Sequence, residues 1–362
     1  MKRKKIALYD PYLDVLGGGE KHILSIIQIL TRRGYDLDIF WQTDLADEFI
    51  RKFNLKLPKI RFLPNIFKDR GNFWQKIVTL KKYDLFFYIS DGSYFFSPAK
   101  KNYVFAMVPD QKIYPASFIN RIKTLNFSFI ANSQFTANRL ARWGLSAKVV
   151  YPYIDQSLLN INLNDPPKEK IILSVGRFFP HLHSKRHDLA IQAFQQLKKA
   201  DPIYADYRLL LAGSVQKQDQ GYLQELQKKA GADLAIKFLI DPPNNQLINL
   251  YQKTEYCWHF TGYGIDAEKH PEKVEHLGIS PIEAMAAGAL TFAYSAGGPK
   301  EIIQPGQTGF LFTDIDDLIF QMQQLKKDNA KQETVKKQAN IFVKKHFSYD
   351  VFNQKVISVF QP

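Results

Sequence analysis

The sequence predicts two doubly wound α/β domains, each built on a parallel β-sheet. Three observations lead to this fold class: the chain has 362 residues, 45% of them are hydrophobic, and short apolar runs alternate with helical stretches. A chain of this length accommodates two domains of roughly 150 residues each. Alternating strands and helices are typical of a parallel sheet whose two faces are covered by helices.

The first half of the chain contains seven apolar runs of strand length, with helical segments between several of them. The first run leads into the glycine-rich turn Gly17–Glu20, and the helix after this turn has apolar residues at a spacing of three to four. Glycine lets a backbone approach a phosphate closely, although this turn is neither a dinucleotide fingerprint nor a Walker A motif. Strands are expected at Lys5–Tyr9, Asp36–Gln42, Ile60–Leu63, Leu85–Ile89, Tyr103–Val108, Phe127–Asn132 and Ala147–Val150.

A polar stretch flanked by Tyr151–Tyr153 and Pro166–Pro167 is the predicted linker between the domains. The end of the chain, Asp316–Phe360, has a helical pattern rich in lysine. The strands of the second domain are expected at Lys170–Val175, Tyr207–Ala212, Ile236–Leu239, Tyr256–Phe260, Leu290–Ala293 and within Gly306–Leu311.

The charge of the chain is uneven. Residues 1–160 hold 25 of the 49 lysines and arginines but only 13 of the 35 acidic residues, so most of the net charge of +14 lies in the first half. This excess fits an anionic partner such as a membrane surface, a lipid diphosphate or an acidic glycan. A solvated basic surface explains it equally well.

Several classes of protein are disfavoured by composition. The only cysteine, Cys257, lies in an apolar run and is expected to be a buried thiol, so an internal disulfide is excluded. No apolar run reaches the roughly 18 residues of a membrane span, and the basic N-terminus lacks the apolar core of a signal peptide. The histidines are not at zinc spacing, so no metal site is predicted.

The most informative stretch is Glu275–Gly288. Ser280 is expected to be an N-cap, with Pro281 at the first helical position, Glu283 completing a capping box and Gly288 ending the helix. The start of a helix presents N–H groups that suit a phosphate, and a carboxylate on either side of it can bind hydroxyl groups. A nucleoside diphosphate that carries a sugar would use all three features.

Two carboxylates separated by seven residues, with His276-Leu277-Gly278-Ile279 between them and an Ala-Met-Ala-Ala-Gly helix after them, resemble the Glu-x7-Glu motif. This motif belongs to retaining GT-B glycosyltransferases, in which two Rossmann-like domains face a cleft. The resemblance implies that Glu275 contacts the donor sugar and Glu283 the ribose. The donor-binding residues that it implies are Gly18, Gly19, Arg177, Lys185, Arg186, His276, Leu277, Gly278, Ile279, Glu283, Gly297 and Gly298.

A Gly-Arg pair after the first strand of the second domain, with a lysine at the next helix start, resembles the element that binds the donor diphosphate in this family. The resemblance gives this role to Arg177 and Lys185, and Arg186 is the alternative to Lys185 because the loop between them is long. Fixed cations stabilise the charge that develops on a leaving diphosphate without a metal. The expected catalytic residues are therefore Glu275, Arg177 and Lys185.

Two features of the first domain leave alternatives open. Many relatives have a histidine two residues before the proline that corresponds to Pro109, and this chain has Met107 there. The nearby Asp110 is the alternative residue for the role of that histidine, on the acceptor side. Phe73, Trp74, Ile77 and Leu80 share one face of a predicted helix with Lys76 beside it. That face fits packing on the sheet, or binding to a membrane surface.

The resemblance implies a metal-independent retaining hexosyltransferase without a cofactor, which moves a hexose from a UDP- or GDP-sugar to a saccharide or lipid-linked acceptor. Residues 1–155 and 347–362 would form the acceptor-side domain, and residues 166–346 the nucleotide-sugar domain. The alternatives are a GT-B nucleotide-sugar epimerase and a non-catalytic nucleotide- or glycan-binding subunit. The expected location is the cytoplasm, at the inner face of a membrane, and no nucleic acid partner is expected.

Overall fold

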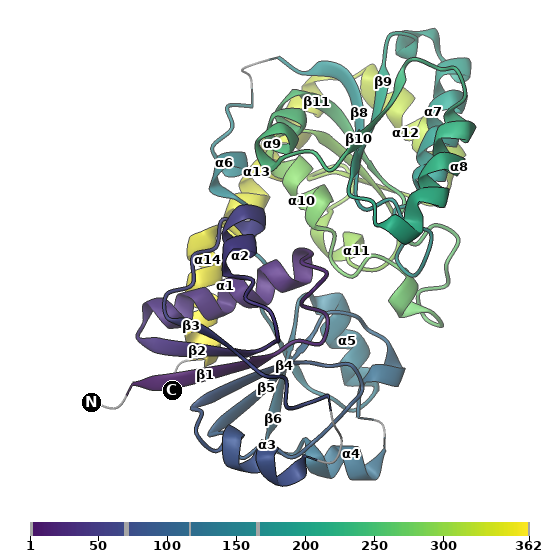
Figure 1. The fold of residues 1–362 in the computed structure, drawn as a ribbon. Helices are drawn as coiled ribbons and strands as arrows, with labels where there is room; N and C mark the ends of the chain where they lie inside the picture. Colours follow the sequence, from purple (N-terminus) through teal and green to yellow (C-terminus); the bar gives the residue numbers. More distant parts are fainter. Residues whose placement is uncertain (1–2, 69–71, 116, 164–166, 361–362) are drawn as a thin grey trace. The chain divides into compact units, whose positions relative to one another are not determined.

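The computed structural model describes residues 3–68, 72–115, 117–163 and 167–360 (Figure 1). Met1, Lys2 and Pro166, which belong to the predicted basic N-terminus and linker, lie outside these residues. The chain divides into two compact units: unit 1 comprises Met1–Pro152 and Phe352–Pro362, and unit 2 comprises Tyr153–Val351. Each unit is an α/β fold, as the alternating pattern predicts.

Unit 1 contains a sheet of seven strands in the order β3-β2-β1-β4-β5-β6-β7, and all neighbouring strands are parallel. Each of the seven strands predicted for this half of the chain is present, with ends shifted by at most two residues. The strands are β1 (Lys4–Tyr9), β2 (Tyr35–Phe40), β3 (Ile60–Leu63), β4 (Leu85–Ile89), β5 (Lys101–Ala106), β6 (Phe127–Ala131) and β7 (Ala147–Val149).

Local capping explains where the helices of unit 1 begin. The first helix starts directly after Gly17, whose N–H donates to the carboxylate of Glu20 at 2.6 Å. Ser133 caps α5 by accepting the N–H of Thr136 at 3.0 Å. The helices are α1 (Gly18–Arg32), α2 (Ala46–Phe53), α3 (Phe73–Leu80), α4 (Phe118–Lys123) and α5 (Gln134–Arg142), with the 3-10 helix η1 (Gln111–Ile113).

The last helix, α14 (Tyr349–Phe360), contributes its residues from Phe352 onward to unit 1. The ring of Phe360 packs on Phe87 and Tyr103, with ring centroids 5.3 and 4.8 Å away. Phe352 lies 5.8 Å from the ring of buried His22. The aromatic side chains of this helix, which comes at the end of the chain, thus complete the core formed by the first part of the chain.

Unit 2 contains a parallel sheet of six strands in the order β10-β9-β8-β11-β12-β13. The strands are β8 (Glu169–Val175), β9 (Arg208–Gly213), β10 (Ile236–Ile240), β11 (Thr254–His259), β12 (Leu290–Tyr294) and β13 (Phe310–Phe312). The helices are α6 (Gln156–Leu159), α7 (His187–Ala200), α8 (Gln220–Ala230), α9 (Asn244–Lys253), α10 (Ile279–Ala286), α11 (Pro299–Ile302), α12 (Ile315–Lys326) and α13 (Asn329–Phe347), with the 3-10 helices η2 (Pro202–Tyr204), η3 (Lys217–Asp219) and η4 (Pro271–Lys273).

The strand order of both sheets reverses once, between β1 and β4 in unit 1 and between β8 and β11 in unit 2. In open parallel sheets, ligands bind outside the carboxyl ends of the strands at such a reversal. Unit 2 therefore has its candidate site where β8 ends at Val175 and β11 ends at His259.

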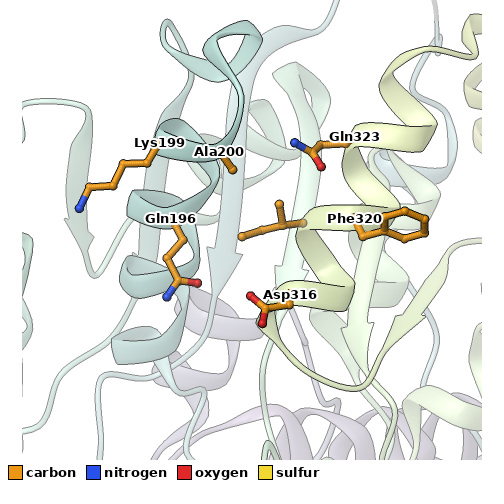
Figure 2. Close-up of a pocket in the computed structure, with 7 residues that line it drawn as sticks. Gln196, Lys199, Ala200, Asp316, Phe320 and Gln323 are labelled. Carbon is orange, nitrogen blue, oxygen red and sulfur yellow. The ribbon is translucent and has the colours of Figure 1, made fainter.

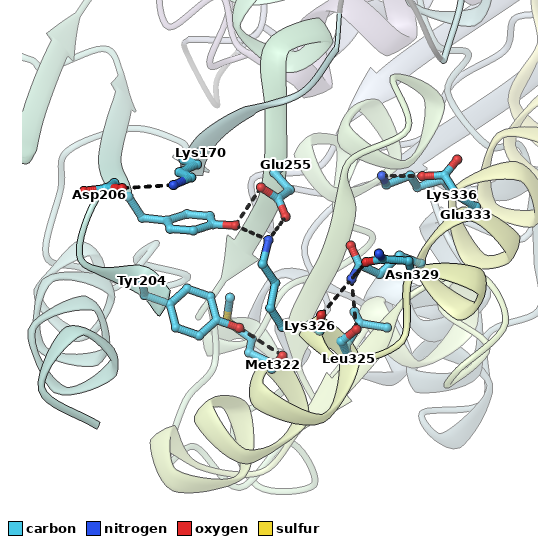
Figure 3. Close-up of polar contacts among 12 residues, drawn as sticks. Lys170, Tyr204, Asp206, Glu255, Met322, Leu325, Lys326, Asn329, Glu333 and Lys336 are labelled. Carbon is cyan, nitrogen blue, oxygen red and sulfur yellow. Dashed lines mark hydrogen bonds and ion pairs between the residues drawn. The ribbon is translucent and has the colours of Figure 1, made fainter. Parts of the chain in front are cut away.

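A partly buried ion pair holds α12 to the sheet of unit 2 (Figure 3). The ammonium of Lys326, at the end of α12, lies 2.8 Å from the carboxylate of Glu255 on β11 and 2.6 Å from the hydroxyl of Tyr207. The same hydroxyl donates to Glu255 at 2.7 Å. Because both charges have close partners, burial leaves neither of them uncompensated.

The structure shows how the predicted apolar face of α3 is used. The predicted apolar face is divided: Leu80 is buried and Ile77 is half-buried, whereas Phe73 and Trp74 are exposed. Lys76, predicted to lie beside this face, is buried. No helix among the described residues is both long and apolar enough to cross a bilayer. Cys257 is buried, as predicted.

The carboxyl end of β1 carries a buried acid. Asp10 is 1% exposed; one of its oxygens accepts the N–H of Tyr12 at 2.9 Å, and the other has no partner among the described residues. Burial raises the pKa of Asp10 to about 7, and the negative charge of Glu20 adds to this effect. Ionised Asp10 is therefore unfavourable in folded unit 1.

This leads to a prediction for stability against pH. The folded pKa of Asp10 is raised above its unfolded value, so its stabilising contribution is complete below about pH 4 and is lost as pH rises through about 7. Asp10→Asn should therefore gain about 2–3 kcal/mol of unfolding free energy relative to wild type between pH 5 and pH 8.5. Urea denaturation at both pH values measures this, with Asp14→Asn, an exposed neighbour, as the matched control. A constant difference would contradict the assignment.

Candidate functional site

The loop after β8 brings Lys185 to the end of the sheet. Gly176 has φ +158°, and a Cβ at this position would collide with the side chain of Lys185. A Cβ at Gly213, which ends β9, would collide with the carbonyl of Gly176. These two glycines let the Lys185 stem lie directly across the ends of β8 and β9.

Glu275 is the centre of the site in unit 2. One of its carboxylate oxygens lies 2.5 Å from the ammonium of Lys185 and 2.8 Å from Nε2 of His259, the last residue of β11. The other oxygen accepts the backbone N–H of His276 at 3.2 Å. Both oxygens of this buried carboxylate are therefore held by donors from separate parts of unit 2.

The charges of the site follow from these contacts. Burial opposes ionisation of Glu275, but Lys185 and His259 outweigh burial and hold the pKa of its carboxyl well below the usual range. Burial lowers the pKa of His259, and Glu275 offsets only part of this effect. At neutral pH the carboxylate is an acceptor without a proton, so neutral His259 must donate from Nε2.

The structure separates the two candidate cations that follow the loop. Arg186 forms a two-point ion pair with Asp188, with both N–O distances at 3.0 Å, whereas the neighbouring Lys185 reaches Glu275. The guanidinium of Arg177 stacks on the ring of Phe179 at 4.5 Å and makes no ion pair with a described residue. Its N–H groups thus remain available for an anion beside Lys185.

The start of α10 differs from the predicted capping box. The helix begins at Ile279 after Gly278, which has φ +102°, so Ser280 is not the N-cap and Pro281 is not the first helical residue. Glycine takes this left-handed conformation without strain, which lets the chain turn into the helix two residues early. Gly288, with φ +73°, follows the end of the helix, as predicted.

Glu283 has a partner other than the predicted cap. Its carboxylate accepts the hydroxyl of Tyr251, on α9, at 2.9 Å. Glu283 lies within α10 and is half-buried, whereas Glu275 precedes the helix and is buried. The two carboxylates of the Glu-x7-Glu stretch therefore have separate partners and different environments.

The loop after β12 supports the backbone around Glu275. Gly298 donates its N–H to the carbonyl of Glu275 at 2.7 Å, and a Cβ at Gly297 would collide with that carbonyl. A Cβ at Gly298 would collide with Leu277. The predicted donor-site segments 275–279 and 297–298 thus lie against each other, and only glycine fits their contact.

The candidate residues of unit 1 form a second group. Met107 packs on Gly19, the second residue of α1, where a Cβ would collide with its sulfur. Asp110 accepts the N–H of Lys112 at 3.0 Å and thereby caps η1. Gly18 begins α1. The methionine therefore lies directly against the glycine-rich turn.

Three residues of the unit 2 site were not predicted from the sequence: His259, His183 and Tyr251. His259 could have been found as the last polar residue of a strand that borders the reversal of the sheet. The ring of His183 lies 5.2 Å from that of His276, and its buried Nδ1 has no partner among the described residues. Burial lowers the pKa of His183 to about 3, with His276 and Lys185 acting in the same direction.

A shallow hollow elsewhere in unit 2 contains none of these residues (Figure 2). It has a volume of about 420 Å³ and lies between α7 and α12, where Gln196 and Asp316 are among its lining residues. Among the described residues, no group of three or more His, Cys, Asp or Glu is arranged to hold a metal. The convergent polar groups are those around Glu275.

The chain is similar to several mannosyltransferases. The human protein named GDP-Man:Man(3)GlcNAc(2)-PP-Dol alpha-1,2-mannosyltransferase is 30% identical over 265 residues, 62% of this chain and 51% of the human protein. The mouse protein of the same name is 26% identical, over 84% of this chain and 76% of its own length. Alpha-1,3/1,6-mannosyltransferase ALG2 of Rhizomucor pusillus is 26% identical over 52% of this chain and 47% of that protein. This chain spans about half the length of the human relative.

Solved structures show the same fold. Anabaena Alr3699/HepE in complex with UDP and glucose has a TM-score of 0.74 and 18% identity, with 98% of each chain covered. The glycosyltransferase from Rickettsia africae ESF-5 has a TM-score of 0.76 and 15% identity, covering 100% of this chain and 98% of its own. The predicted GT-B fold of two Rossmann-like domains is therefore confirmed.

The family follows from the second half of the chain. The profile of glycosyl transferases group 1 matches residues 157–342, just over half of the 362 residues. This range contains the loop after β8, the end of β11 and all of α10. The resemblance inferred from the Glu-x7-Glu stretch is thus confirmed, and the chain belongs to the glycosyl transferases group 1 family.

Proposed function

We propose that this protein is a retaining mannosyltransferase that moves a mannose from GDP-mannose to a hydroxyl of a lipid-linked saccharide. The observation that carries this proposal is the buried Lys185–Glu275–His259 cluster at the reversal of the unit 2 sheet, beside Arg177. The names of the relatives favour GDP-mannose and a dolichyl diphosphate-linked acceptor. A UDP-sugar is the competing donor, because HepE was solved with UDP and glucose.

In this proposal the ionised Glu275 accepts hydrogen bonds from hydroxyls of the donor sugar. Its low pKa makes it a poor proton donor, and both oxygens already have donors, which favours a positioning role over nucleophilic attack. Lys185 has three N–H bonds and gives one to Glu275, so the others can reach the diphosphate. Arg177 would share the charge that develops as the diphosphate leaves.

The other donor residues are assigned by position. The N–H groups at the start of α10, from Gly278 to Ser280, would donate hydrogen bonds to the diphosphate, and Glu283 would bind the ribose. Gly18 and Gly19 of unit 1 would approach the substrate at the start of α1. Arg186 is assigned a structural role, because its guanidinium is already paired with Asp188.

We further propose that the protein works at the cytoplasmic face of a membrane, where a lipid-linked acceptor is presented. The relatives named for dolichyl diphosphate acceptors and the basic first half of the chain support this location. An anionic surface attracts clustered lysines and arginines, and salt weakens the attraction.

The two carboxylates should differ in their kinetic roles. Glu275→Gln should lower kcat about 100-fold or more, because a charged contact to the reacting sugar is lost. Glu283→Gln should mainly raise the KM for the donor, since the amide can still accept from Tyr251 but binds the ribose more weakly.

The matched control is Glu272→Gln on the same loop, which should leave kcat unchanged. Buried Glu275 also pairs with Lys185, so each variant must first be shown to be folded by thermal denaturation. A folded Glu275→Gln protein with wild-type kcat would remove the assignment.

Arg177 should contribute strongly to nucleotide affinity. Arg177→Ala should weaken GDP binding by about 2 kcal/mol, or roughly 30-fold, because charge-assisted hydrogen bonds are lost. Titration calorimetry with GDP and UDP measures this effect. Arg208→Ala is the matched control, because Arg208 begins β9 at the opposite end of the strand and pairs with Glu169. Equal affinities of wild type and Arg177→Ala would exclude the diphosphate role.

Transfer should not require a divalent metal, because Arg177 and Lys185 supply fixed positive charge at the leaving group. The purified protein is incubated with GDP-mannose or a UDP-hexose and a soluble analogue of a lipid-linked saccharide, with and without EDTA. We expect an α-mannoside by NMR in both conditions. Activity that returns only with Mn²⁺ or Mg²⁺ would refute metal independence.

Two alternative functions are separated by the same assay. A nucleotide-sugar epimerase would change the donor sugar without transfer to the acceptor. A non-catalytic subunit would bind the nucleotide-sugar without consuming it. This alternative is tested because Met107, which packs on Gly19, stands where many relatives have a histidine. Formation of the mannosylated acceptor excludes both alternatives.

A further inference from the structure

The short helix α4 is turned with its polar side inward. Its apolar residues and the one after its end are exposed: Phe118 by 78%, Ile119 by 64%, Ile122 by 50% and Leu125 by 81%. The residue buried beside them is Thr124, while Asn120 and Lys123 are half-buried. A helix that lies on a sheet normally buries its apolar face, so this face needs another partner.

The helix α3 also exposes large apolar side chains, although it buries Leu80. Phe73, Trp74 and Val78 are 49%, 75% and 59% exposed, whereas Lys76 is buried. The ammonium of Lys76 lies inward, 5.9 Å from the ring centre of Phe67 and 5.8 Å from that of Phe95. The helix thus buries Lys76 and Leu80 and leaves three large apolar side chains in solvent.

The two helices cover the same face of the unit 1 sheet. The chain crosses from β3 to β4 through α3, and from β5 to β6 through α4, in the same direction along the sheet. Right-handed crossovers in one direction place their helices on one face, as Figure 1 shows for α3 and α4. We call the seven exposed apolar side chains of α3 and of residues 118–125 the α3–α4 patch.

Lysines and arginines lie in or directly after both helices of this patch. Residues 111–154 contain six lysines and arginines and no aspartate or glutamate. Lys81 and Lys82 follow α3 directly, and Arg121 is part of α4; all three are exposed. A second copy of the chain would bring like charges together at such a surface, whereas an anionic bilayer complements both its charge and its apolar side chains.

We infer that the α3–α4 patch docks unit 1 on an anionic lipid bilayer. The apolar side chains enter the boundary between headgroups and acyl chains, and the surrounding lysines and arginines lie against lipid phosphates. This inference rests on the proposed function for its reason, since a lipid-linked acceptor is reached only from the membrane surface.

The test uses the full chain and vesicles of phosphatidylcholine, with or without phosphatidylglycerol. Wild type should co-sediment with the anionic vesicles, and salt should weaken binding. Phe118→Ser/Ile122→Ser should lower the vesicle affinity at least tenfold. Leu234→Ser/Phe320→Ser, which changes two exposed apolar residues of unit 2, is the matched control and should bind as wild type. Because all four side chains are exposed, thermal unfolding should be unchanged.

Fluorescence gives a second readout. Trp74 in α3 should shift its emission to shorter wavelength and be quenched by brominated lipid, and this signal should be absent in Trp74→Phe. Equal binding to neutral and anionic vesicles, or wild-type binding by the α4 variant, would overturn the inference. So would a loss of self-association in the α4 variant without a loss of vesicle binding, because the patch would then be a contact between copies.

The experiments distinguish a failure of the patch from a failure of the proposed function. Patch variants should transfer sugar to a soluble acceptor analogue at the wild-type rate, since the patch lies outside the residues assigned to catalysis. Vesicle binding through the patch without any transferase activity would support the patch and refute the function. Transferase activity in a protein whose vesicle binding does not change when the patch is altered would support the function and refute the patch.

Discussion

The site of unit 2 depends on one buried interaction, in which a single carboxylate oxygen of Glu275 faces both the ammonium of Lys185 and the imidazole of His259. Lys185 lies 90 residues away in the sequence and His259 lies 16 away. This contact fixes the loop after β8, the end of β11 and the approach to α10 around one charge. Removing one member would leave a buried charge without its partner, which is strongly destabilising.

The glycines around this contact are required because neighbouring groups occupy the positions where their side chains would lie. The Lys185 stem occupies the position of a side chain at Gly176, and the backbone of Glu275 and Leu277 occupies the positions at Gly297 and Gly298. A larger residue at any of these glycines would move one of the groups that hold Glu275. Packing of backbone on backbone thus positions the carboxylate, while the ion pair keeps it ionised.

Unit 1 differs in how it uses polar and apolar groups. At the end of β1 it buries Asp10, whose ionisation is unfavourable in the fold, and on one face it exposes large apolar side chains of α3 and α4. The first feature links stability to pH, and the second gives the unit a surface suited to lipid. Both depart from the usual distribution of polar and apolar residues in a soluble domain.

The sequence by itself determined the strands, the parallel α/β fold and the family, because apolar runs and the Glu-x7-Glu stretch are local patterns. It did not determine the start of α10, since the left-handed Gly278 competes with a good capping box at Ser280. It also did not identify His259, or show that Lys185 rather than Arg186 reaches Glu275, because Glu275 lies 16 residues from His259 and 90 from Lys185. Periodicity showed that α3 has an apolar face, but only the tertiary structure decided that Leu80 of this face is buried while Phe73 and Trp74 are exposed. The neighbouring aromatic rings of Phe67 and Phe95 accommodate Lys76.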